Sequence, residues 1–257
     1  MSDQSSPRGH NIPMHVGRRL VDELMHHARK VPSLPLARTC NVGRLVAARS
    51  AARPTPSWMA IFMRAYGLVS QEMPDLRQAW IPFPYPRIYQ HPISECGVLI
   101  EREVDGAPVV LGTKIRAPEQ LTLAEIDQHL RDVREKPVDK VSSFRQLLRL
   151  ARLPWPLRRW FLWRVISMCG YRRARRLGTF VISSLGNYGV EQMHPLTALT
   201  TYFTFGPISS TGEVTLKVIY DHRVMDGRTV ARVLVRLDEM LNSVLLDELH
   251  RLGRLAA

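Results

Sequence analysis

The heptapeptide Asp221-His222-Arg223-Val224-Met225-Asp226-Gly227 decides how the rest of this sequence is interpreted. It lies between a run rich in β-branched and aromatic residues at 214–220, which predicts a strand, and a predicted helix at 226–242. A histidine at such a junction has a pKa near neutrality and can take a proton from an alcohol, amine or thiol. His222 is therefore a candidate catalytic base, and a solvated or core histidine is the alternative interpretation.

The two residues that close the heptapeptide have expected roles in shaping the turn. Asp226 can fix the loop by accepting hydrogen bonds from backbone or arginine donors. Gly227 is expected to let the chain pass through a backbone conformation that is closed to other residues. We therefore treat His222, Asp226 and Gly227 as parts of one candidate site.

A second motif lies upstream of the histidine, in the run Gly178-Thr179-Phe180-Val181-Ile182-Ser183-Ser184-Leu185-Gly186, which continues to Tyr188-Gly189. It resembles the GTFTISNLG segment of the acyltransferase component of 2-oxo-acid dehydrogenase complexes. The segment 220–227 resembles the DHRxxDG signature of the same family, and the two motifs occur in the order that the family shows. Weaker similarity covers most of the chain, including Arg18-Arg19-Leu20, which resembles an arginine motif in the family's first helix.

This resemblance implies an α+β fold like that of chloramphenicol acetyltransferase, a two-layer sandwich with a mixed β-sheet. It also implies a homotrimer with active sites between subunits. On this basis His222 is the general base, and Ser183 of a neighbouring subunit donates a hydrogen bond to the tetrahedral oxyanion. Asp226 is structural in the family and is expected to pair with Arg18 or Arg19.

The implied reaction moves an acyl group from a coenzyme A or acyl-carrier thioester to a hydroxyl or amine acceptor. No tightly bound cofactor is expected, since the acyl-CoA or acyl carrier protein acts as co-substrate. The sequence departs from the family in two places. Only the segment 1–15 precedes the first predicted helix, so we expect a free-standing member without a lipoyl domain, and the family's Asn-Pro-Pro loop is replaced by His194-Pro195-Leu196-Thr197.

Periodicity and turn signals predict alternating helices and strands in one domain, 13–257, after a disordered segment, 1–12. Asp105-Gly106 predicts a tight hairpin turn, and Thr122 with Glu125 has the spacing of a capping box. The expected helices are 16–30, 57–70, 121–134 and 226–242. The expected strands are 34–41, 97–104, 109–115, 179–184, 199–205 and 214–220.

Positive charge is concentrated in a helical insertion at about 141–176. The chain carries a formal net charge of +13, yet the stretch 141–178 holds ten arginines and no aspartate or glutamate. Three tryptophans accompany them, and Pro154 and Pro156 interrupt the helical pattern. Such a segment can lie on an anionic membrane, bind the phosphates of coenzyme A or the acidic face of a carrier protein, or form ordinary solvated helices.

Several other classes are disfavoured by the sequence. No nucleic-acid-binding signature accompanies the basic stretch, and three widely spaced cysteines suggest neither a disulfide framework nor a metal site. Residues 1–11 lack the apolar run of a secretory signal, so we expect a cytoplasmic protein that can also be peripheral on a membrane. The rival function is a catalytically silent scaffold or membrane tether with the same fold.

Overall fold

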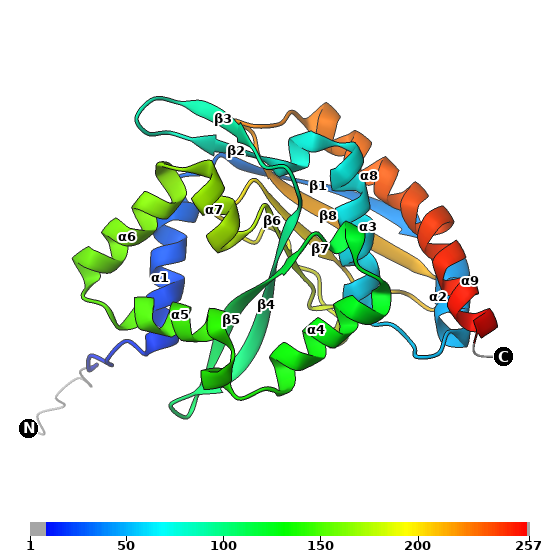
Figure 1. Cartoon of the computed structure of the whole chain (residues 1–257), viewed down its shortest axis with the longest axis horizontal. Helices are drawn as coiled ribbons and strands as arrows, with labels where there is room; N and C mark the ends of the chain where they lie inside the picture. Colours follow the sequence, from blue (N-terminus) through cyan, green and yellow to red (C-terminus); the bar gives the residue numbers. More distant parts are fainter. Residues whose placement is uncertain (1–8, 256–257) are drawn as a thin grey trace, which may run out of the picture.

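The computed structural model describes residues 9–255 (Figure 1). The expected disorder of 1–12 falls mainly on residues 1–8, which lie outside the described part, while residues 9–12 are exposed and form no helix or strand. The helices are α1 (Val16–Ala28), α2 (Gly43–Ala51), α3 (Trp58–Glu72), α4 (Leu123–Glu135), α5 (Ser142–Arg152), α6 (Trp155–Ser167), α7 (Gly170–Leu177), α8 (Gly227–Met240) and α9 (Leu246–Leu255). The strands are β1 (Ser33–Asn41), β2 (Gln78–Ile81), β3 (Arg87–Gln90), β4 (Glu95–Val104), β5 (Ala107–Arg116), β6 (Phe180–Ser183), β7 (Thr201–Phe205) and β8 (Glu213–Asp221).

Six strands form one mixed sheet in the order β1-β8-β7-β6-β4-β5. The two pairs that involve β6 are parallel, and the others are antiparallel. Strands β2 and β3 form a separate hairpin. Figure 1 shows α3 and α8 packed against the large sheet. The predicted α+β class with a mixed sheet and a helical layer is therefore confirmed.

Helix α3 is the central helix of the core. Ser57 begins it as an N-cap, and its side chain accepts a hydrogen bond from the backbone N–H of Ala60. The Phe62 ring stacks 4.1 Å from that of Phe205, and the Tyr66 ring lies 4.4 Å from that of Phe180. Aromatic pairs of this kind contribute about 1 kcal/mol each beyond the area that they bury. They fix α3 against the parallel strands at the centre of the sheet.

Two local predictions are confirmed in detail. Asp105 and Gly106 have φ values of 51° and 75°, the left-handed pair that a two-residue hairpin requires. Thr122 and Glu125 form the reciprocal hydrogen bonds of a capping box at the start of α4. Both signals depend only on neighbouring residues, which is why the sequence shows them.

Three elements were not predicted: helices α2 and α9 and the β2–β3 hairpin. Helix α2 has no side-chain N-cap, so its start carries no local signal. Strands β2 and β3 have only four residues each, and three prolines stand in the segment 82–86 that joins them. Proline interrupts the alternating pattern by which a strand is recognised.

The arginine-rich stretch forms three helices, α5, α6 and α7. In α5 the apolar side chains of Phe144, Leu148 and Ala151 are buried, as the helical spacing predicts. Pro154 ends the first helix and serves as the N-cap of α6. Among residues 9–255, no helix combines the length and apolar character needed to cross a membrane.

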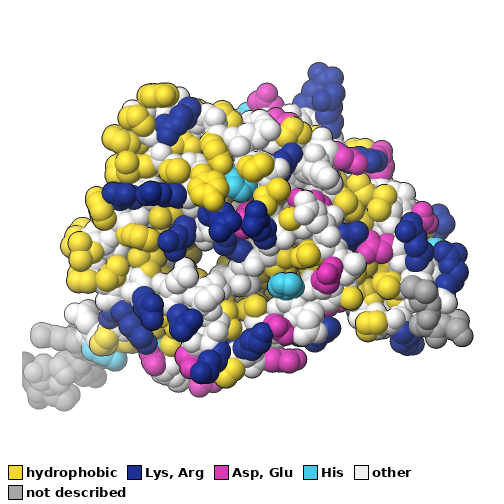
Figure 2. Space-filling view, viewed as in Figure 1, with side chains coloured by type: hydrophobic (Ala, Val, Ile, Leu, Met, Phe, Trp, Pro, Cys, Tyr) yellow, Lys and Arg dark blue, Asp and Glu magenta, His cyan; other side chains and the backbone are white. Residues whose placement is uncertain are grey.

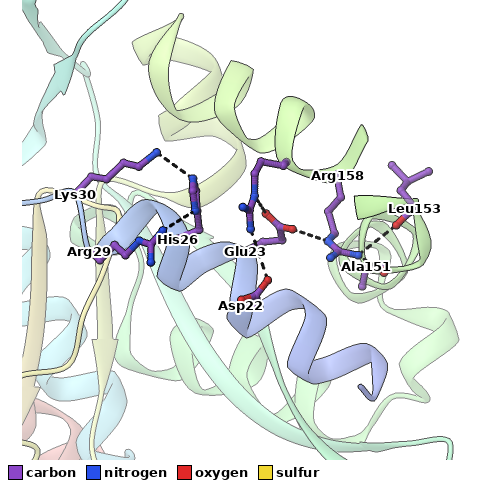
Figure 3. A network of polar contacts seen from close by, with 9 residues as sticks. Asp22, Glu23, His26, Arg29, Lys30, Ala151, Leu153 and Arg158 are labelled. Carbon is purple, nitrogen blue, oxygen red and sulfur yellow. Dashed lines mark hydrogen bonds and ion pairs between the residues drawn. The ribbon is translucent and has the colours of Figure 1, made fainter. Parts of the chain in front are cut away.

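A buried ion pair joins α6 to α1. The Glu23 carboxylate is fully buried, and its Oε1 accepts a hydrogen bond of 3.0 Å from Nε of Arg158, which is itself buried (Figure 3). The second oxygen, Oε2, accepts a hydrogen bond of 3.1 Å from Nε of Arg159. Arg158 also donates to the backbone carbonyls of Ala151 and Leu153, so its guanidinium group holds the turn between α5 and α6 as well.

We expect Glu23→Ala to lower the free energy of unfolding by about 3 kcal/mol or more, because Arg158 would stay buried without its carboxylate. Asp22→Ala is the matched control: Asp22 is half exposed and lies 3.6 Å from Arg159, so its loss should cost under about 1 kcal/mol. Urea denaturation followed by tryptophan fluorescence measures both. Equal small losses in the two variants would contradict the assigned role of Glu23.

Candidate active site

His222 occupies the first position after β8. Its backbone N–H donates a hydrogen bond of 3.0 Å to the carbonyl of Pro32, directly beyond the last pair of the β1–β8 ladder, Ser33 with Asp221. The N–H of Met225 then bonds the carbonyl of Asp221 and closes the turn before α8. The His222 side chain is 45% exposed, so a substrate can reach the imidazole.

Asp226 lies beside the histidine. It is the N-cap residue of α8 but makes no capping hydrogen bond with its side chain. Its Oδ1 lies 3.7 Å from His222 Nδ1, within ion-pair range and beyond hydrogen-bond range. No ion pair joins Asp226 to Arg18 or Arg19 within residues 9–255, and Arg19 Nε instead donates to the carbonyl of Met14. The expected arginine partner is therefore not supplied by the same chain.

Gly227 has a different role from the one expected. It begins α8 with ordinary helical backbone and does not have a positive φ. A Cβ atom at this position would lie 3.3 Å from the hydroxyl oxygen of Tyr220, closer than most Cβ contacts. Close approach to Tyr220, and not backbone strain, is thus the reason why glycine fits here.

The residues on either side of His222 form an ion pair that the sequence analysis missed. Asp221 is fully buried, and its carboxylate accepts hydrogen bonds of 2.9 Å and 2.7 Å from Nε and Nη2 of Arg223. The Arg223 guanidinium group also lies 5.5 Å from the ring centroid of Trp80. This two-point contact restrains the turn that carries His222. The sequence signal for this ion pair was the presence of an aspartate and an arginine on either side of the histidine.

Arg173 is a second missed residue, and it comes from the arginine-rich segment. It is buried, and its guanidinium nitrogens donate hydrogen bonds of 2.6 Å to the carbonyls of Trp80 and Ala198. Burial lowers the pKa of Arg173 to about 10, so the group remains charged at neutral pH. Helix α7 thereby supports the segment before β7, whose Thr200 carbonyl accepts the N–H of Asp221.

Ser183 ends β6 on the side of the sheet away from α3. Burial raises the pKa of the neighbouring Tyr202, while a hydrogen bond with Ser183 acts in the opposite direction. The adjacent Ser184 is already committed, because its hydroxyl donates to the carbonyl of Phe205. Ser183 thus contacts a neighbouring side chain, whereas Ser184 is bonded to the backbone.

Ser183 and His222 do not meet within one chain. Ser183 pairs with Thr204, and Thr204 pairs with Lys217 of β8, which precedes His222 by five positions in the chain. Strand geometry then separates the serine and the histidine by roughly 16 Å along the sheet and about 10 Å across it. Any site that uses both side chains requires two copies of the protein.

The described part of the chain shows no metal cluster, and its two buried cysteines are unreactive. Residues 9–255 contain no group of three or more metal-ligand side chains placed to hold an ion. Burial raises the pKa of the Cys40 thiol to about 12 and that of Cys96 well above its usual value, which makes both poor nucleophiles. His222 is exposed and has a carboxylate at its side.

Comparison with known proteins identifies the fold. No family model and no curated protein matches the chain. The cubic core of the pyruvate dehydrogenase multienzyme complex matches with a TM-score of 0.69 and 17% identity over 95% of this chain and 96% of that one. Dihydrolipoamide acetyltransferase of Azotobacter vinelandii matches with a TM-score of 0.67 and 17% identity, over 95% of this chain and 96% of that one. A chloramphenicol acetyltransferase matches with a TM-score of 0.53 and 12% identity, over 89% of this chain and 96% of that one. The chain therefore has the fold of dihydrolipoamide acyltransferase catalytic cores and chloramphenicol acetyltransferase, as its motifs predicted.

Proposed function

We propose that this protein is an acyltransferase that moves an acyl group from a coenzyme A or acyl-carrier thioester to a hydroxyl or amine acceptor, with His222 as general base. The observation that supports it most is the position of His222 on this fold, exposed at the end of β8 with Asp226 beside it. In the dihydrolipoamide acetyltransferase of Azotobacter vinelandii, a serine, a histidine and an asparagine were investigated for their role in that enzyme's catalytic mechanism. That histidine and asparagine are four positions apart, as are His222 and Asp226.

The proposed chemistry follows from the orientation of the imidazole. A carboxylate near Nδ1 favours the tautomer that carries its proton there, so His222 Nε2 is the atom that accepts a proton. It takes that proton from the acceptor hydroxyl or amine as the oxygen or nitrogen attacks the thioester carbonyl. When the tetrahedral intermediate collapses, the C–S bond breaks and the thiolate takes the proton from Nε2.

The second half of the proposed site comes from a neighbouring copy in a trimer. Ser183 of that copy would donate its hydroxyl hydrogen to the oxyanion, a contribution of about 3 kcal/mol. Exposed apolar side chains follow Ser183 along the chain, and they are Leu185, Tyr188, Val190, Met193 and Leu196. Apolar groups so exposed are suited to burial against another subunit.

Release of free thiol from a panel of short-, medium- and long-chain acyl-CoA donors, with hydroxyl and amine acceptors, tests the general base. We expect His222→Ala to lower kcat by about 10²- to 10⁴-fold, the usual contribution of a positioned base. His129→Ala is the control, because His129 is exposed on α4 and bonds only the carbonyl of Glu125. Absence of turnover with every CoA or carrier-linked donor would favour the catalytically silent scaffold.

Ser183→Ala should lower kcat by about 10²- to 10³-fold, as loss of one oxyanion donor does. Because the two groups belong to different copies, mixed oligomers of His222→Ala and Ser183→Ala chains contain some sites with both groups intact. We expect such mixtures to release thiol faster than either variant does alone. Mixed oligomers that form but stay inactive would exclude a site between subunits.

A further inference from the structure

Large apolar side chains project from α6 and from the turn between β2 and β3. On α6 they are Trp155, Leu157, Trp160 and Phe161, and three of these are more than half exposed. On the turn they are Phe83 and Tyr85. We call these six residues the α6 surface. The left side of Figure 2, where α6 lies, shows hydrophobic and basic side chains gathered together.

The two parts of the α6 surface are joined although they are distant in sequence. The Phe83 ring lies 5.5 Å from that of Trp163, and the Phe83 N–H donates to the carbonyl of Ser167 at the end of α6. Arg87 reinforces the junction by donating a hydrogen bond of 2.9 Å to the carbonyl of Met168. The turn and the helix therefore present one fixed surface.

An arginine lies near each of the three most exposed aromatic rings of the α6 surface. Arg159 lies 5.1 Å from the Trp155 ring, Arg164 5.0 Å from the Trp160 ring and Arg87 5.3 Å from the Tyr85 ring. Arg159 also bonds Glu23, so its charge is compensated. Arg87 donates to the carbonyls of Phe83, Tyr85 and Met168, so its guanidinium group is already engaged. No carboxylate within residues 9–255 pairs with Arg164, and its guanidinium group is suited to bind phosphate oxygens.

The composition of this surface favours a lipid partner. Tryptophan and tyrosine prefer the boundary between acyl chains and headgroups, and arginine is attracted to anionic headgroups. The stretch 141–178 supplies no acidic side chain, so two copies that paired through this same surface would oppose arginine with arginine. Projecting tryptophans would need a matching groove on a protein partner, whereas a fluid lipid interface adapts to them.

We propose that the α6 surface docks this protein on an anionic phospholipid surface, with Leu157, Trp160 and Phe161, which share one face of the helix, entering the interface and Arg164 binding lipid phosphates. This docking does not depend on the proposed acyl transfer. The Glu23 ion pair beneath α6 holds the helix in place, so docking requires no rearrangement of the helix. The helix lies along the surface and does not cross it.

Co-sedimentation of the full chain with vesicles of phosphatidylcholine, with and without phosphatidylglycerol, tests this proposal. We expect binding to the anionic vesicles alone, weakened by high salt. The variant Arg164→Glu should reduce the partition coefficient by about tenfold or more, since it removes one arginine, which contributes about 1 kcal/mol near an anionic surface, and adds a negative charge. Leu157→Ser/Trp160→Ser/Phe161→Ser should reduce it as strongly.

The control is Val235→Ser/Val244→Ser, which removes one exposed apolar side chain from α8 and one from the π-helical segment Leu241–Leu245 that follows it, and should bind as wild type does. Circular dichroism checks that every variant is folded, and His222→Ala should bind vesicles normally whether or not it is active. Failure of the wild-type chain to bind anionic vesicles, or undiminished binding by both surface variants, would overturn the proposal. A changed oligomeric state in the surface variants, measured by light scattering, would instead assign the α6 surface to contact between copies.

Discussion

The pairing of β1 with β8 is the constraint on which the candidate site depends. Nine residue pairs align the two strands and end with Ser33 opposite Asp221, and the N–H of His222 adds one more bond, to the carbonyl of Pro32. Because side chains alternate along a strand, a register shift of one residue would send every side chain of β8 to the opposite face. The ladder thus determines where the sheet ends and from which point the imidazole projects.

Charges buried around this turn reinforce it from two directions. Asp221 holds Arg223 immediately beside the histidine, and Arg173 of α7 binds backbone carbonyls that lie behind it. Glu23 in turn anchors α6 to α1 through Arg158. A buried pair of this kind adds little net stability, but loss of one partner is costly. Within the arginine-rich segment, the buried Arg158 and Arg173 therefore hold parts of the fold together, whereas the remaining arginines are at least partly exposed to solvent.

The two motifs that hold the candidate catalytic residues were visible in the sequence because each is a short run in which neighbouring residues carry the signal. His222 and Ser183 could be named, and the capping box at Thr122 with Glu125 and the Asp105-Gly106 turn could be placed, since their geometry is set within a few positions. Helix α2 and the β2–β3 hairpin escaped because their formation depends on packing and not on local pattern.

The sequence by itself therefore determined the fold class, most strands and helices of the core, and the identity of the candidate catalytic groups, because periodicity and motifs encode them locally. The tertiary structure decided what depends on residues distant in the chain. It showed that Gly227 is small because of Tyr220, that Arg173 supports the carbonyl of Ala198, and that Ser183 and His222 lie too far apart to act within one copy. Such relations arise from strand register and packing, which no local pattern of residues specifies.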